Sequence, residues 1–175
     1  VKAALDARFA ECRLEMHPTK TKIVYCKDGS RKGRYPNTAF DFLGYTFRPR
    51  TVKNRRRNSM FVSFTPAVSK AAQKSMRQTT RKLNYRNRTE LSLADIARLH
   101  NPILRGWLEY YGKFAPSGMY PVLRHFNRSL VDWAMRKYRR LKDHKTRAIR
   151  FLEGVLERQP NLFVHWRRGM VGAFA

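Results

Sequence analysis

Residues 101–112 have the sequence NPILRGWLEYYG, and this stretch decides the fold expected for the second half of the chain. Pro102 suits the first turn of a helix, where its missing N–H costs nothing, and Asn101 before it is a good N-cap. Gly106 then falls inside the helix, where glycine costs about 1 kcal/mol relative to alanine, so we expect a close packing partner there. Apolar residues recur at helical spacing and predict a core helix filled with aromatic side chains: Ile103, Leu104, Trp107, Leu108 and Tyr111.

A long helix with one cationic face is expected on either side of this stretch. The first runs from Pro66 to about Tyr85 and the second from Pro121 to Lys142, each with an apolar stripe opposite its cations. Like charges four residues apart destabilise a helix unless they are neutralised, which favours nucleic-acid contact over a merely solvated face. The cations are Lys70, Lys74, Arg77 and Arg81 on the first helix, and Arg124, Arg128, Arg136, Arg139 and Lys142 on the second.

The charge of the whole chain supports the same interpretation. Its 175 residues include 38 Lys and Arg against 12 Asp and Glu, a formal net charge of +26. Self-repulsion at such a charge destabilises the compact state, and a polyanionic partner removes that cost. Nucleic acid is the leading candidate, because distributed cations are rewarded by phosphate neutralisation and counterion release. A membrane surface is the alternative polyanion, but no apolar run is long enough to span a bilayer and no signal peptide is evident.

The first third of the chain has mixed secondary structure. We expect a helix over Val1–Glu15, strands over Thr21–Cys26 and Ala39–Arg48, a basic tip at Thr51–Asn58, and a strand over Met60–Thr65 that closes an antiparallel hairpin. Because Val1 is not Met and its helix lacks a capping box, we expect the sequence to begin inside a domain.

The remainder is expected to be helical, which makes the fold class α+β. Further helices are predicted over Ser92–His100, with Ser92 and Asp95 as a weak capping box, over Pro102–Phe114 and over Lys145–Arg158. Leu162–Trp166 is expected to be a short extended or packed segment.

Metal-dependent and nucleophilic chemistry find little support in the sequence. Cys12 and Cys26 are too few for a disulfide scaffold and are expected to be reduced thiols. The five histidines share no metal-ligand spacing with a cysteine or carboxylate, and no phosphate-binding glycine loop or nucleophile elbow is present. His125 needs no role of its own.

Three segments, in this order, carry a resemblance to a known family. NPILRGWLEYYG resembles the LNPxxRGWxxYY hallmark of the maturase-specific domain, or thumb, of group II intron reverse transcriptases. His100 stands where that family usually has Leu. LEMHPTKTKIVYCKD (14–28) and FDFLGYTF (40–47) resemble the sixth and seventh conserved blocks of the same enzymes, and LFVHWRRG (162–169) resembles the end of bacterial members. The matching positions expected to have structural roles are Phe42, Leu43, Gly44, Tyr45, Asn101, Pro102, Arg105, Gly106, Trp107, Tyr110 and Tyr111.

The resemblance implies a domain organisation and a function. Residues 1–65 would be the end of a polymerase palm, with a small antiparallel strand remnant, 66–143 the helical maturase thumb, and 144–175 a C-terminal helix and tail. The expected function is binding structured group II intron RNA to promote splicing, in the cytoplasm of a bacterium that carries this mobile element. In a complete protein the same surface would hold an RNA/DNA template–primer. The alternative is an unrelated basic RNA- or ribosome-binding protein.

The same resemblance sets expectations for chemistry. Group II polymerases need a YADD motif whose carboxylates hold metal ions, and the sequence lacks it, so we expect no polymerase activity from this chain alone. No cofactor or metal site is expected in this chain. Magnesium is expected only for the complete polymerase. Palm strands without neighbours would leave open edges through which a homodimer could form. The residues expected to contact RNA are Lys20, Lys22, Arg55, Arg56, Arg57, Lys70, Lys74, Arg77, Arg81, Arg124, Arg128, Arg136, Arg139 and Arg140.

Overall fold

The structure of the chain is a computed structural model that describes residues 1–31, 33–54 and 56–169. Its helices and three-stranded antiparallel sheet form an α+β fold, so the predicted fold class is confirmed. The chain divides into two compact units, the first made of Val1–Phe40 and Arg48–Phe64 and the second of Asp41–Phe47 and the chain from Thr65 onward. The three segments expected from the sequence remain a prediction.

The first unit contains one helix and a long stretch of irregular chain. Helix α1 spans Lys2–Glu11, shorter than expected, and none of its residues is buried. The strand predicted over Thr21–Cys26 is wrong, because this segment is irregular; the Tyr25 N–H donates instead to the Asn37 carbonyl (2.9 Å). Alternating β-branched residues form a strand only where a neighbouring strand satisfies their backbone groups.

The sheet is an antiparallel meander whose strands follow chain order: β1 (Phe40–Phe42), β2 (Tyr45–Asn54) and β3 (Ser59–Val68). The single strand predicted over Ala39–Arg48 is therefore wrong. Leu43 and Gly44 have φ values of 48° and 78° and turn the chain between β1 and β2. Positive φ at both central residues is the pattern of a two-residue hairpin turn. The hairpin predicted between β2 and β3 is confirmed.

The first long helix begins later than predicted. Pro66 lies inside β3, and helix α2 spans Lys70–Leu83. A proline is tolerated in β3 because this strand lies at the edge of the sheet, where no neighbour on that side needs its missing N–H. The helix starts after Ser69, whose hydroxyl accepts a hydrogen bond from the Ala72 N–H (3.1 Å) and satisfies one free donor of the first turn.

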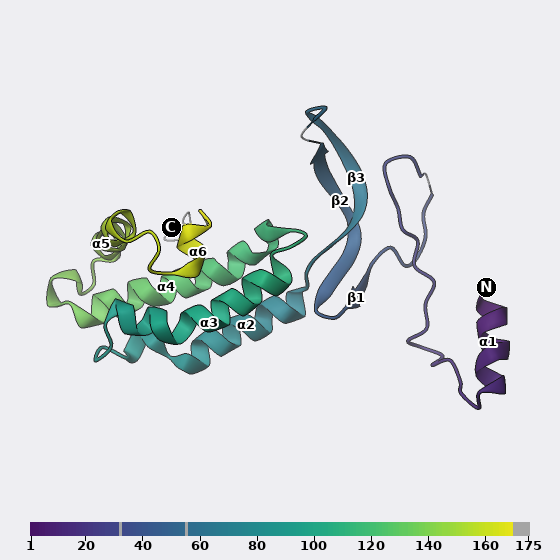
Figure 1. Ribbon diagram of the computed structural model, residues 1–175, viewed down its shortest axis with the longest axis horizontal. Coiled ribbons are helices and arrows are strands. Elements are labelled where there is room, and N and C mark those ends of the chain that lie inside the picture. The colour runs from purple at the N-terminus through teal and green to yellow at the C-terminus, as the bar shows by residue number, and fades with distance from the viewer. Residues whose placement is uncertain (32, 55, 170–175) are drawn as a thin grey trace. The chain divides into compact units, whose positions relative to one another are not determined.

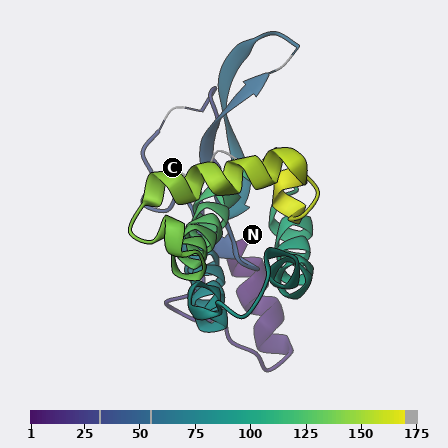
Figure 2. The same ribbon diagram turned by 90° about the vertical axis from the view of Figure 1, so that its left-hand side faces the viewer.

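The second unit is a helical bundle in which short 3₁₀ turns join the longer helices. Figure 1 shows α2, α3 and α4 side by side, and Figure 2 looks along them and shows α5 crossing from the side of α4 to the side of α3, where α6 lies. After α2 the elements are η1 (Tyr85–Asn87), α3 (Leu93–Tyr111), η2 (Pro116–Met119), α4 (Tyr120–Lys137), η3 (Arg139–Leu141), α5 (Lys145–Arg158) and α6 (Val164–Arg167).

Helix α3 is continuous, so the predicted break before Pro102 is wrong. A proline inside a helix lacks the N–H that would bond to the preceding turn, which costs about 3 kcal/mol. Tertiary packing offsets this cost, since Leu104 and Leu108 on the same helix are 0% and 1% exposed. The capping box at the start of the helix is confirmed, because Ser92 and Asp95 each accept a hydrogen bond from the other's backbone N–H (3.1 Å).

Helix α4 supplies most of the core. It ends at Lys137, before the predicted Lys142, and η3 follows it. Two of its side chains hold the loop before α3: the Trp133 indole N–H donates to the Arg88 carbonyl (3.1 Å), and the Lys137 ammonium donates to the Thr89 and Leu91 carbonyls (both 2.8 Å). The apolar stripe expected on this helix comprises Leu123, Phe126, Leu130, Trp133, Ala134 and Leu141. It is confirmed, since the first five are buried in α4 and Leu141 is buried in η3.

The end of the described chain packs on the bundle. The α5 bounds match the prediction, and the segment around Leu162–Trp166 is packed, as one of the two predicted alternatives proposes. It is not extended, because Val164–Arg167 forms the short helix α6. Phe163 and Trp166 are 0% and 3% exposed.

Candidate nucleic-acid interface

Two motifs of the sequence, FLGY (42–45) and RGWLEYY (105–111), contact each other in the helical unit. The hydroxyl of Tyr45 donates a hydrogen bond to the Tyr110 carbonyl. In the other direction, the Tyr110 hydroxyl donates to the Leu43 carbonyl (3.0 Å), and the rings of Tyr45 and Tyr111 have centroids 5.3 Å apart. These contacts fasten the turn at Leu43 and Gly44 to the C-terminal end of α3, so both tyrosines of α3 have a packing role.

Gly44 is placed where a side chain does not fit. Its φ is +78°, and a Cβ added there would lie 2.5 Å from the Tyr111 hydroxyl oxygen. We expect Gly44→Ala to lower the free energy of unfolding by about 1–3 kcal/mol, because both the left-handed backbone and the close approach oppose a methyl group. Chemical denaturation monitored by circular dichroism measures this change.

Gly106 provides the matched control for that substitution. The close packing partner predicted for it is wrong, since an added Cβ would have no atom within 4 Å outside its own helix. Gly106→Ala should therefore raise the free energy of unfolding by about 0.5–1 kcal/mol through helix propensity alone. An equal loss of stability in the two variants would contradict the contact assigned to Gly44.

Asn101 does not cap a helix, because it lies within α3. Its side chain instead holds the segment before α6: the amide nitrogen donates to the Leu162 carbonyl (2.9 Å), and the amide oxygen accepts from the Val164 N–H (3.1 Å). This paired contact needs both a donor and an acceptor on one short side chain, which asparagine provides. The other motif positions Pro102, Arg105 and Gly106 are exposed.

Helices α2 and α4 lie against each other, and the structure brings their predicted RNA-binding cations onto neighbouring elements. Arg77 is half-buried and the others are exposed. Within the described chain no ion pair is formed by this set, which we call the α2/α4 basic face: Lys70, Lys74, Arg77, Arg81, Arg124 and Arg128.

Other predicted cations have different surroundings. Arg136 donates to the Arg86 carbonyl (3.3 Å) and the Asn87 side-chain oxygen (2.7 Å), and the Arg140 guanidinium lies 5.9 Å from the centre of the Phe151 ring. Arg139 is exposed at the end of α4. These contacts do not prevent RNA binding, because all three side chains remain exposed, but they give two of them a partner within the fold.

The remaining predicted cations belong to the first unit. Lys20 and Lys22 are exposed on irregular chain, and Arg56 and Arg57 are exposed beside the turn between β2 and β3. The side chain of Asn54 orders that turn by accepting hydrogen bonds from both arginine N–H groups (3.0 and 3.2 Å). Arg55 lies outside the described residues.

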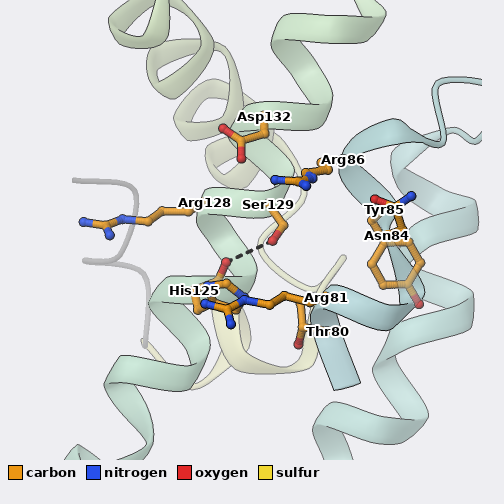
Figure 3. A pocket seen from close by; sticks show the side chains of 9 residues that line it. All are labelled: Thr80, Arg81, Asn84, Tyr85, Arg86, His125, Arg128, Ser129 and Asp132. Carbon is orange, nitrogen blue, oxygen red and sulfur yellow. Dashed lines mark hydrogen bonds between the residues drawn. The ribbon is translucent and has the colours of Figure 1, made fainter. Parts of the chain in front are cut away.

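A hollow of about 350 Å³ lies between α2, η1 and α4. Figure 3 shows that the side chains around it come from these three elements and that Arg81 and His125 meet there. The Ser129 hydroxyl donates to the His125 carbonyl (3.1 Å), so its hydrogen is already used within α4. The lining residues are Thr80, Arg81, Asn84, Tyr85, Arg86, His125, Arg128, Ser129 and Asp132.

The electrostatics of the hollow are dominated by positive charge. Burial lowers the pKa of His125, and the nearby guanidinium groups of Arg81, Arg77 and Arg128 lower it further, whereas Asp132 acts in the opposite direction. The Nε2 atom of His125 is buried and has no hydrogen-bond partner among the described residues. No role for His125 was predicted from the sequence. The spacing of His125, Arg128 and Asp132 on one helical face was the pattern that could have indicated the hollow.

Other kinds of site find no support in the described residues. Across residues 1–31, 33–54 and 56–169, no group of three or more His, Cys, Asp or Glu side chains could hold a metal ion. Both cysteines are free and exposed. In this part of the chain, no helix combines the length and the apolar character that crossing a bilayer requires.

Comparison with known proteins identifies the helical unit. Residues 73–151 match the family described as "Group II intron, maturase-specific domain". This match begins within α2 and ends within α5, so it contains the hollow and every cation of the basic face except Lys70. The chain has no match among curated proteins or solved structures.

Residues 73–151 are therefore similar to the maturase-specific domain, consistent with the C-terminal part of a group II intron maturase. This similarity supports a maturase role in group II intron splicing and implies intron RNA as a partner.

Proposed function

We propose that the chain binds structured group II intron RNA through the α2/α4 basic face and thereby promotes splicing. The observation that carries this proposal is the position of the face: its cations form no ion pair within the described residues and lie on two adjacent helices, and all but Lys70 fall inside the residues that match the maturase-specific domain. Such cations gain most from a dense row of phosphates, because each neutralised phosphate releases a counterion.

The rigidity of the face suits a folded RNA. Helix α4 is anchored by fully buried side chains such as Phe126 and Trp133, so Arg124 and Arg128 are presented from a fixed backbone. A-form RNA is recognised mostly through its backbone and shallow minor groove, where basic helices supply charge at set spacings without reading bases. Binding would stabilise the compact intron fold, since the bound phosphates repel one another less.

A second use of the same face belongs to a longer protein. If this chain is joined to a polymerase palm, as the FLGY and KTKIV segments indicate, the face would hold an RNA/DNA template–primer duplex. This proposal has the same physical basis, because the heteroduplex also presents two phosphate backbones.

The experiment compares group II intron RNA with a folded RNA of equal length that contains no intron. We expect the chain to bind the intron at least about tenfold more tightly, because a folded intron offers a matching arrangement of phosphates. We also expect it to raise the splicing rate at a magnesium concentration too low for efficient splicing of the RNA alone. Equal affinity for both RNAs with no effect on splicing would favour the alternative, a general basic RNA- or ribosome-binding protein.

A further inference from the structure

The hollow between α2, η1 and α4 differs from the rest of the basic face because it is concave. In Figure 3 the Arg81 side chain lies beside His125, whereas the Arg128 side chain is directed away from Arg81 and Arg86. Arg81, Arg86 and Arg128 line it from three separate elements, and Asp132 is the one carboxylate among its lining residues. None of the three arginines forms an ion pair within the described chain. Elsewhere on the face, Lys74 and Arg124 are exposed and do not line the hollow.

This concentration of positive charge has a cost in the free protein. Arg81 and Arg77 from α2 and Arg128 from α4 all act on the partly buried imidazole of His125, while Asp132 opposes them. Like charges gathered around a poorly hydrated group repel each other more strongly than the same charges in water. An anion placed among them would remove this repulsion and gain charge-assisted hydrogen bonds, which are about twice as strong as neutral ones.

The size of the hollow limits what that anion can be. A volume of about 350 Å³ is at the lower end of small-molecule sites and cannot admit a helix or a duplex. The Thr80 hydroxyl donates to the Met76 carbonyl and the Ser129 hydroxyl to the His125 carbonyl, so the guanidinium groups are the main donors left to face a ligand. A guanidinium group recognises a phosphate through two parallel N–H bonds.

We propose that this hollow seats a single phosphate group of bound RNA, held by the Arg81 guanidinium beside His125, by the Arg128 guanidinium once its side chain turns toward the phosphate, and by Arg86 at the margin. The inference rests on the proposed function, because the RNA that enters the hollow is the RNA bound by the α2/α4 basic face. The phosphate in the hollow would be held at one fixed position, whereas the other cations of the face can contact phosphates at many positions. This contact would fix the register of the RNA on the two helices.

The test compares lysine and glutamine at two arginines of the same helix. At the seat, Arg128→Gln and Arg128→Lys should each weaken intron RNA binding about tenfold, because lysine keeps the charge but lacks the paired donors. At the matched control, Arg124→Gln should weaken binding by a similar factor, while Arg124→Lys should stay within about twofold of the unchanged chain. Full rescue by lysine at position 128 would overturn the seat and leave the proposed function intact.

A second readout follows the imidazole of His125 by NMR. RNA bound at the seat should raise the pKa of His125, because a nearby phosphate favours the protonated ring. Inorganic phosphate and adenosine monophosphate serve as separate probes for a free phosphate. A rise with RNA but not with either small probe supports an RNA backbone phosphate, and a rise with the small probes alone overturns it. If the chain does not bind intron RNA at all, that result contradicts the proposed function itself, and the phosphate seat with it.

Discussion

Replacing four arginines of the basic face with glutamine should lower the affinity for group II intron RNA by on the order of a thousandfold at about 0.1 M salt. The variant carries glutamine at Arg77, Arg81, Arg124 and Arg128, which lie on adjacent helices and have no ion-pair partner within the described chain. Each lost phosphate contact also lowers the slope of log affinity against log salt by about 0.7–0.9, so the slope should fall by about three. Filter binding across a salt series measures both quantities.

The control for this variant removes the same charge elsewhere. Glutamine at Lys145, Arg147, Arg150 and Arg158 on α5 replaces exposed cations outside the face and changes the net charge equally. We expect this variant to lose less than about tenfold in affinity, since long-range attraction alone is screened beyond about 10 Å at this salt. Equal losses in the two variants, both still folded by circular dichroism, would show that net charge and not the face governs binding.

Mild acid should destabilise the helical bundle. Burial lowers the pKa of His100 to about 4, and burial together with His100 lowers the pKa of His165 to about 3. Both values lie below 6.5, so the unfolded chain binds more protons, and the free energy of unfolding falls as pH decreases from about 6.5 toward 4 and 3. His100 alone accounts for on the order of 3 kcal/mol over this range, a large part of the stability of a small domain. Denaturant unfolding at a series of pH values measures the loss.

His100→Leu should remove part of this acid sensitivity. The His100 ring stacks on Phe126 with centroids 4.2 Å apart, and both of its nitrogens are buried without a hydrogen-bond partner among the described residues. An apolar side chain avoids that unpaired burial, so we expect a gain of about 1–3 kcal/mol at pH 7 and a shallower loss below pH 6.5. His144→Gln, which removes an exposed imidazole before α5, is the control variant. A variant at position 100 with the original acid sensitivity would contradict the burial of this imidazole.

Elements governed by local sequence were predicted well. The bounds of α5, the Ser92–Asp95 capping box and the buried face of α4 follow from helical spacing and short-range hydrogen bonds. These patterns need no information about the rest of the fold.

Elements governed by tertiary context were not predicted well from the sequence. Pro102 lies inside α3 and Pro66 inside β3, because buried neighbours in one case and an edge position in the other offset the cost of proline. The segment Thr21–Cys26 was expected to be a strand but has no neighbouring strand to pair with. The alternation of its residues gives no information about whether such a neighbour exists.

The candidate site shows the same division. Cationic stripes were visible in the sequence, since both lie at helical spacing on α2 and α4. The adjacency of these helices depends on the packing of the bundle, and the hollow at His125 depends on η1 as well. The contact between Tyr45 and the tyrosines of α3 joins residues far apart in the chain, so two motifs noted separately form one structural feature.

The most direct test of the account is a titration of the isotopically labelled chain with group II intron RNA, followed through its backbone amide NMR signals. We expect the changes in amide chemical shift to concentrate in α2 (Lys70–Leu83) and α4 (Tyr120–Lys137) and to disappear at high salt. The amide signals of α5 (Lys145–Arg158) should not change. Shifts centred on α5, or tight binding that leaves α2 and α4 unperturbed, would contradict it.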